Sequence, residues 1–152
     1  MMNVCIGGTF SPLHKGHKLL IKTACELAGT NGKVFIGLTS VEMVTQKGPI
    51  EPYAKRKHAL EQFLKEEHVQ ADVEIQPLHD LYGPAIEREY QAIVVSPETK
   101  KVAEDINRKR KEQQKKPLRI VVIPLVLAED HHPICSTRIR RHEIDENGTV
   151  LR

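Results

Sequence analysis

Cysteines and aromatic residues are scarce in this 152-residue sequence, which has three cysteines and no tryptophan. Cys5, Cys25 and Cys135 lie far apart and form no CxxC pair, so the pattern predicts neither a disulfide framework nor a cysteine zinc cluster. No apolar run approaches the roughly 20 residues that span a membrane, and the N-terminus lacks the features of a signal peptide. We therefore expect a soluble, cytoplasmic protein.

An excess of charge of one sign is also lacking, since 23 lysines and arginines stand against 20 acidic residues and the formal net charge is +3. So small an excess favours small anionic ligands over nucleic acid. The basic run 108–119 has no interleaved aromatics and contains glutamate and glutamine, so it predicts a solvated surface and no nucleic-acid partner. The length and composition predict a single domain over residues 1–152, and a homo-oligomer is compatible with them.

Short runs rich in valine and isoleucine alternate with helical patterns along the chain. This alternation is typical of right-handed βαβ units around a parallel sheet. The expected fold is therefore α/β, a Rossmann-like doubly wound parallel sheet of about five strands with helices on both faces. Strands are expected at 2–6, 33–39, 71–78, at the start of 91–99 and at 118–127, and helices at 17–28, 53–66, within 82–90, from residue 98 and from residue 136.

Three local patterns make finer predictions. Alternating polar and apolar residues predict that 71–78 is a more exposed strand, whereas 118–127 is expected to be the last central strand. Ser96 is expected to cap the helix that follows, with Pro97 in its first turn. The second half of that helix, "RKRKEQQKK", is polar throughout and is expected to project into solvent.

The segment "GGTFSPLHKGHK", residues 7–18, follows the first expected strand and opens the first helix. Its leading glycines permit close approach of the backbone to a ligand, and Thr9 offers a hydroxyl. The N–H groups of Gly16 and His17 begin a helix whose dipole favours anions. The segment is therefore a candidate phosphate site.

His14 and His17 flank a glycine in this segment and admit three interpretations. They can donate hydrogen bonds or positive charge to phosphate oxygens in a transition state, with Gly16 leaving room for the phosphate. They can bind zinc, although no HExxH motif or cysteine pair supports a metal site and 131–132 are the only further histidines in reserve. They can also be surface histidines in an ordinary turn.

Three segments are expected to meet at one edge of the sheet. In a doubly wound sheet, ligands bind beyond the carboxyl ends of the strands, where the strand order reverses. Residues 7–18, "SPET" at 96–99 and "CSTRIR" at 135–140 each follow an expected strand. Their shared position favours one site built from all three.

"GGTFSPLHKGH" resembles the T/HxGH signature of the nucleotidyltransferase superfamily, and "CSTRIR" resembles its second signature, ISSTxxR. The segments "IGLTSVEMV", "IVVSPET" and "PLRIVVIPLV" are most similar to the archaeal type of phosphopantetheine adenylyltransferase, and the resemblance covers nearly the whole chain. Ser11 stands where the family often has aspartate, and Cys135 stands at the first serine of the second signature.

This resemblance implies that the chain transfers the adenylyl group of ATP to 4'-phosphopantetheine, giving dephospho-CoA and pyrophosphate, with Mg2+ bound through the triphosphate and not by protein ligands alone. Thr9 would hold the attacking phosphate beside the α-phosphate, while His14 and His17 stabilise charge there. Ser136 and Thr137 would hold the β- and γ-phosphates at a helix start. The implied nucleotide site comprises Gly8, Thr9, Phe10, His14, Gly16, His17, Ser96, Glu98, Ser136, Thr137 and Arg138.

The resemblance also implies an acceptor site. Lys47, in the loop after the second strand, would meet the phosphate of phosphopantetheine, and a solvated loop lysine is the alternative. Arg56 has a similar role, although lysines flank it on both sides, and Asp80 lies in a loop that resembles one near the acceptor. The implied catalytic residues are His17, His14, Thr9 and Lys47, and the implied acceptor site comprises Thr9, Lys47, Arg56 and Asp80.

Two alternative functions remain open. Another small-molecule nucleotidyltransferase, such as a cytidylyltransferase or an FAD or nicotinamide mononucleotide adenylyltransferase, would share the phosphate-binding residues and differ in its base and acceptor pockets. A non-catalytic module that binds nucleotide or RNA would keep the fold without turnover. Within the phosphate site, Arg138 is preferred to Arg140 as the arginine that contacts phosphate.

Overall fold

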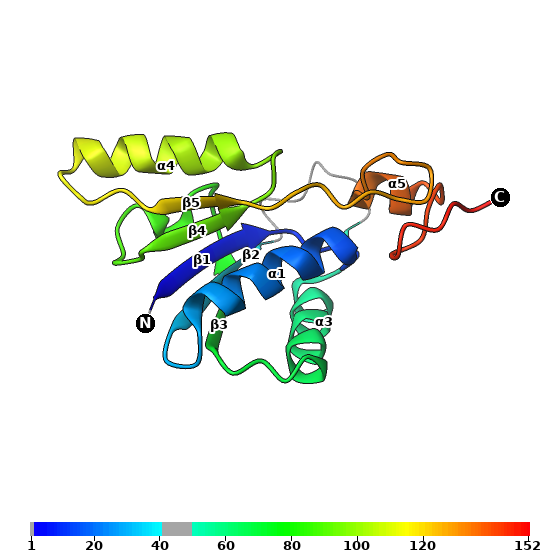
Figure 1. Cartoon of the computed structure of the whole chain (residues 1–152), viewed down its shortest axis with the longest axis horizontal. Helices are drawn as coiled ribbons and strands as arrows, with labels where there is room; N and C mark the ends of the chain where they lie inside the picture. Colours follow the sequence, from blue (N-terminus) through cyan, green and yellow to red (C-terminus); the bar gives the residue numbers. More distant parts are fainter. Residues whose placement is uncertain (1, 41–49) are drawn as a thin grey trace.

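Five parallel strands form a sheet at the centre of the protein (Figure 1). The structure is a computed structural model, and it describes residues 2–40 and 50–152. The strands are β1 (Asn3–Gly8), β2 (Lys33–Thr39), β3 (Asp72–Leu78), β4 (Ala92–Val95) and β5 (Arg119–Val122). Their order across the sheet is β3-β2-β1-β4-β5, and every neighbouring pair is parallel. The order reverses between β1 and β4, because the chain moves outward from β1 to β3 before it crosses to β4.

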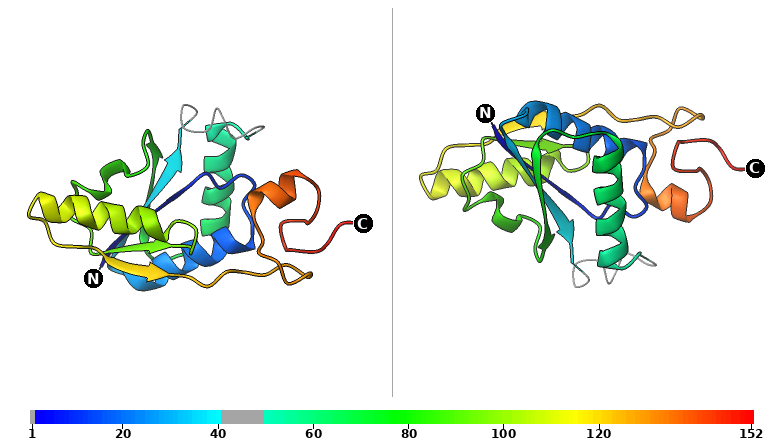
Figure 2. Two further views of the ribbon diagram at one scale, coloured as in Figure 1. Left: turned by 90° about the horizontal axis from the view of Figure 1, so that it is seen from above. Right: turned by 90° about the horizontal axis from the view of Figure 1, so that it is seen from below.

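Helices cover both faces of this sheet. One face packs against α1 (Lys15–Ala28) and α3 (Tyr53–Glu66). The other packs against α4 (Lys100–Glu112) and the short 3-10 helix η1 (Gly83–Ala85), and Figure 2 shows α4 on the side away from α3. The predicted doubly wound α/β fold with helices on both faces is confirmed.

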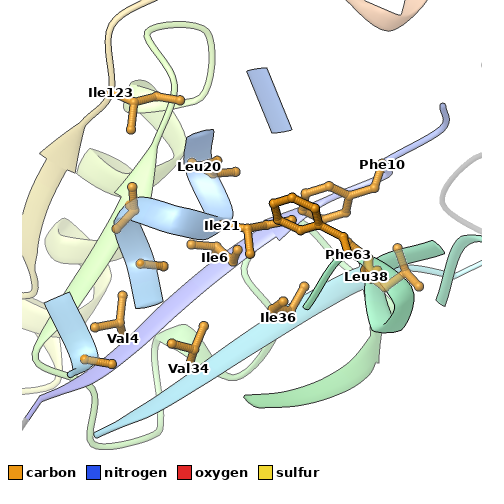
Figure 3. Packing of buried hydrophobic residues seen from close by; sticks show 14 of the residues in the cluster. Val4, Ile6, Phe10, Leu20, Ile21, Val34, Ile36, Leu38, Phe63 and Ile123 are labelled. Carbon is orange, nitrogen blue, oxygen red and sulfur yellow. The ribbon is translucent and has the colours of Figure 1, made fainter. Parts of the chain in front are cut away.

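Alternate residues of the central strands fill the two layers between sheet and helices. Val4 and Ile6 of β1 belong to the core under α1 and α3, as Figure 3 shows, whereas Cys5 between them packs on the α4 side. Ile21 of α1 is fully buried in the first layer. Burying such a side chain contributes about 1.5–3 kcal/mol relative to leaving it exposed. Both layers therefore fix the carboxyl ends of the strands, where the polar segments lie.

The two edges of the sheet differ in how well the sequence predicts them. β3 is an edge strand, in agreement with its alternating pattern. The prediction that 118–127 is a central strand is wrong, because only the four-residue β5 is regular there and it forms the other edge. The apolar character of this run has another cause: Ile123, beyond β5, is buried in the core under α1.

The helix after β4 begins later than predicted. It starts at Lys100, and the preceding residue is Thr99, whose hydroxyl accepts a hydrogen bond from the Ser96 N–H at 3.1 Å. Ser96 therefore lies in a turn and does not cap α4. The basic end of α4 is also not fully solvated, because Arg110 is buried and donates hydrogen bonds to carbonyls of η1 and the residues after it.

The chain after β5 crosses beyond the carboxyl ends of the strands and reaches the start of α1 (Figure 1). There it forms the short helix α5 (Ser136–Arg140), from which Arg140 Nη1 donates to the Ser11 carbonyl at 2.7 Å. The two signature segments, far apart in the sequence, are thus joined directly. In the part of the chain that the structure describes, no helix is long and apolar enough to cross a membrane.

Candidate active site

A cavity of about 430 Å³ opens at the carboxyl ends of β1 and β4, where the strand order reverses. Doubly wound sheets bind their ligands at this position. The structure brings the three polar segments of the sequence together here. Of the residues predicted for the nucleotide site, those on the cavity wall are Gly8, Thr9, Phe10, His14, Gly16, His17, Ser96, Glu98, Ser136 and Thr137.

His14 caps the first helix with its ring. Its backbone is extended, and its Nδ1 accepts hydrogen bonds from the N–H groups of Gly16 at 3.1 Å and His17 at 3.3 Å. A ring nitrogen thus fills the role that serine, threonine or aspartate oxygens usually fill at a helix start. The sequence assigns these two N–H groups to a phosphate, but in the structure both donate to His14 Nδ1 instead.

The backbone holds both imidazoles in one tautomer. His17 Nδ1 accepts from the His14 N–H at 3.3 Å, so both Nδ1 atoms are acceptors. A neutral imidazole then carries its proton on Nε2, where it is a donor. The two rings stack with centroids 3.6 Å apart and planes 17° apart. Both rings lie on the cavity wall, so they can contact the same ligand.

Burial keeps these histidines uncharged. It lowers the pKa of His14 from 6.5 to about 4. Burial, together with the neighbouring His14, lowers the pKa of His17 from 6.5 to about 3, against a smaller opposing contribution from the Pro12 backbone. Both rings are therefore neutral donors at physiological pH, and they contribute no fixed positive charge.

We expect neither ring to titrate between about pH 5 and 8, the range in which an unperturbed histidine changes charge. Histidine 15N chemical shifts, recorded by NMR on the ligand-free protein, measure this directly. Because both folded pKa values are depressed, the stability that the neutral rings contribute is fully present above pH 6.5, and it is lost as the pH falls through about 4 for His14 and about 3 for His17. A midpoint near 6.5 for either ring contradicts the assignment.

Two neighbours fix the positions of the rings. A Cβ atom on Gly16 would lie 3.0 Å from Cε1 of His14. The space beside this glycine therefore holds the His14 ring, whereas the sequence predicts that it leaves room for a phosphate. Phe10 is buried with a φ of 51°, and its ring meets His17 edge-on with centroids 4.9 Å apart. A non-glycine residue in the left-handed region persists where its surroundings hold it. Here it places an aromatic wall beside His17.

Thr9 lies just after β1 and contacts the end of the neighbouring strand. Thr39, the last residue of β2, donates from its hydroxyl to Thr9 Oγ1 at 3.1 Å, and both residues line the cavity. Sequence reasoning missed Thr39. Its place at the carboxyl end of an expected strand is the signal that could have found it.

Arg56 is buried beneath this pair and does not line the cavity. Its Nη1 donates to the carbonyls of Thr39 at 2.8 Å and Thr9 at 3.3 Å, and its Nε donates to the Glu51 carbonyl at 2.8 Å. Burial lowers the pKa of its guanidinium. The sequence predicts that Arg56 contacts the acceptor directly, but its geometry does not support this contact. Arg56 instead holds the backbone at the ends of β1 and β2.

The two arginines of α5 have different surroundings. Arg138 forms ion pairs with Asp130 and Glu143 and does not line the cavity. Arg140 does line it, and its Nη1 is fixed by the Ser11 carbonyl. The geometry therefore favours Arg140 for a phosphate contact, in place of the predicted Arg138. The oxygen that joins the two segments is the backbone carbonyl of Ser11, so this contact does not depend on the serine side chain.

The remaining acceptor residues are placed less directly. Asp80 is exposed, and its Oδ1 accepts from the N–H groups of Tyr82 at 2.9 Å and Gly83 at 2.6 Å. It therefore holds the turn after β3 and is not on the cavity wall, whereas Leu81 and Tyr82 are. Lys47 lies outside the described residues.

Metal-ligating side chains do not gather in the described part of the chain. Within residues 2–40 and 50–152, no three histidine, cysteine or carboxylate side chains could hold a metal ion together. Among those residues, Glu98 provides the only carboxylate of the cavity wall.

Known proteins resemble the chain over nearly its full length. A family profile described as cytidylyltransferase-like matches residues 5–142. A protein named phosphopantetheine adenylyltransferase from Methanosarcina barkeri is 48% identical, over 99% of this chain and 93% of the relative, and its namesake from Methanosarcina acetivorans is 46% identical, over 100% and 97%. A solved structure of a protein of unknown function from Archaeoglobus fulgidus matches with a TM-score of 0.73 and 36% identity, over 80% of this chain and 89% of that one. The chain therefore belongs to the cytidylyltransferase-like family, among the archaeal phosphopantetheine adenylyltransferases.

Proposed function

We propose that this chain transfers the adenylyl group of ATP to 4'-phosphopantetheine, giving dephospho-CoA and pyrophosphate in coenzyme A synthesis. The names of relatives that match along nearly the whole of both chains support this reaction. The single observation that carries it in the structure is the stacked pair of His14 and His17 on the cavity wall, each of whose Nδ1 atoms accepts a backbone N–H, which leaves Nε2 as the donor. Two adjacent neutral donors suit a phosphoryl group that gains charge during transfer.

The acceptor's own phosphate is the nucleophile in this reaction, so the protein needs to position and stabilise groups and not to supply one. An oxygen of that phosphate attacks the α-phosphorus, and the bond to the bridging oxygen of pyrophosphate breaks. His14 and His17 donate to oxygens of the α-phosphate. Thr9 donates to the attacking phosphate, and Arg140 meets the leaving pyrophosphate.

Magnesium is the proposed cofactor. It would arrive bound to the triphosphate and neutralise part of its charge, as metal ions do in phosphoryl transfer. The cavity wall supports this mode of binding, since Glu98 is its only carboxylate in the described part of the chain. The hydroxyls of Ser136 and Thr137, also on the wall, would hold the β- and γ-phosphates.

The cavity extends from this polar end into an apolar space between the sheet and the α4 side. Its walls there include Phe35, Ile93 and Ile106, with Tyr82 and Leu78 from the β3 side. A triphosphate gains nothing from apolar walls, whereas the adenine ring of ATP and the long pantetheine arm, with its methyl groups and terminal thiol, can both bury surface against them. The apolar walls therefore suit substrates that carry such groups.

Pyrophosphate release tests the proposal. The purified protein is incubated with ATP or CTP, each with phosphopantetheine or glycerol 3-phosphate, with Mg2+ and with a chelator. We expect pyrophosphate release only in the mixture that contains ATP, phosphopantetheine and Mg2+, together with a product that has the mass of dephospho-CoA. Release with CTP and glycerol 3-phosphate would assign a cytidylyltransferase instead, and tight ATP binding without release would assign a non-catalytic module.

A further inference from the structure

We propose that Thr39 is a positioning residue which, with Arg56 behind it, fixes the direction in which the Thr9 hydroxyl donates its proton. The inference rests on the proposed function, in which Thr9 contacts a reacting phosphate. It gives a role to one residue that the sequence did not single out and reassigns another from ligand contact to support.

The three side chains form a line of hydrogen bonds that runs into the cavity. Arg56 Nη1 donates to Thr39 Oγ1 at 3.2 Å, and the Thr39 hydroxyl donates to Thr9 Oγ1 at 3.1 Å. Thr39 and Thr9 line the cavity, whereas Arg56 is buried behind them. The line therefore begins in the core and ends at the cavity wall.

The chemistry of the groups sets the direction of this line. A guanidinium has five donors and no acceptor, so Thr39 cannot direct its proton back to Arg56. In the structure that proton goes to Thr9, whose oxygen is thereby an acceptor on that side. The Thr9 proton then turns toward another acceptor, and the oxygens of a bound phosphate dianion are acceptors only. The line is thus polarised from the buried arginine outward.

Burial makes this arrangement stronger than the same contacts in water. Thr39 is 5% exposed and Arg56 is 1% exposed. Hydrogen bonds from a charged donor in such surroundings are strengthened, and successive hydrogen bonds polarise one another. Arg56 is itself held by backbone carbonyls at its Nε and Nη1, so its position does not depend on the hydrogen bond to the Thr39 hydroxyl.

A double-mutant cycle tests this role. Thr39→Val removes the hydroxyl and keeps the shape, and we expect it to lower kcat/KM for phosphopantetheine by about 10-fold, as for one hydrogen bond to a charged group. In a Thr9→Val background the same change should lower the residual rate by less than about 2-fold. Thr39→Ser should restore most of the rate, because it keeps the hydroxyl.

Thr23→Val is the matched control. Its hydroxyl also makes one hydrogen bond, to the Leu19 carbonyl within α1, and Thr23 is not among the residues that line the cavity. The proposal is overturned if Thr39→Val lowers kcat/KM equally in the wild-type and Thr9→Val backgrounds. It is also overturned if Thr39→Val, like the control, leaves kcat/KM unchanged. If the valine variant does not fold, Thr39→Ala carries the same cycle. Turnover by the wild-type protein is measured first. A failure of the proposed role of Thr39 is then distinct from a failure of the proposed reaction.

Discussion

His17→Asn is expected to lower kcat/KM for adenylyl transfer at least about 100-fold, the loss typical of removing one preorganised donor to a developing oxyanion. Asparagine places Oδ1 near the position of the imidazole Nδ1, so it can still accept the His14 N–H at the helix start. It has nothing at the position of Nε2. The variant therefore separates the donor to the α-phosphate from the helix cap.

Three measurements complete this prediction. Steady-state pyrophosphate release gives kcat/KM, and thermal unfolding should show that the variant remains folded. His17→Gln should recover part of the rate, because its amide nitrogen reaches the region of Nε2. His58→Asn on the exposed face of α3 is the control and should leave the rate unchanged. A rate for His17→Asn within a few-fold of the wild type would remove Nε2 from the mechanism.

Arg56→Met is expected to destabilise the fold by about 3–5 kcal/mol, because each buried acceptor left unpaired costs about 1–3 kcal/mol. The guanidinium is 1% exposed and serves the carbonyls of Glu51, Thr39 and Thr9 together. Methionine fills part of the volume and satisfies none of them. A domain of this size should then unfold roughly 10 °C lower, at about 2–4 °C per kcal/mol.

Lys55→Met provides the control for Arg56→Met on the same helix. Lys55 is exposed one residue away, so its substitution should change stability by less than about 0.5 kcal/mol. Chemical denaturation of both variants measures the difference. Equal stability of the two would show that Arg56 does not hold the ends of β1 and β2, and it would return this arginine to the group of candidate ligand contacts.

The sequence predicts the fold well because strand and helix periods are local properties. β2 and α3 begin and end where their apolar patterns do. The wrong predictions are tertiary in origin. Valines and isoleucines in 118–127 resemble a central strand, yet part of that apolar surface is explained by Ile123, which packs beneath α1. No local pattern distinguishes burial against a helix from burial inside a sheet.

The site could be located from the sequence, but its hydrogen bonds could not. The polar segments follow strands, and the sheet brings their ends together. Whether Gly16 offers its amide to a ligand depends on the His14 ring, which takes that amide for itself. The choice between Arg138 and Arg140 depends on Asp130, whose ion pair with Arg138 no spacing rule predicts. Such pairings are decided by distances that the sequence does not contain.

A crystal structure with Mg2+ and α,β-methylene-ATP tests the central claim most directly. We predict that the α-phosphate oxygens lie within about 3.2 Å of Nε2 of His14 and His17, the range of an N–H donor. The β- and γ-phosphates should lie beside Ser136 and Arg140. A nucleotide bound elsewhere, or histidine Nε2 atoms that coordinate a metal ion and not phosphate oxygens, would contradict the account.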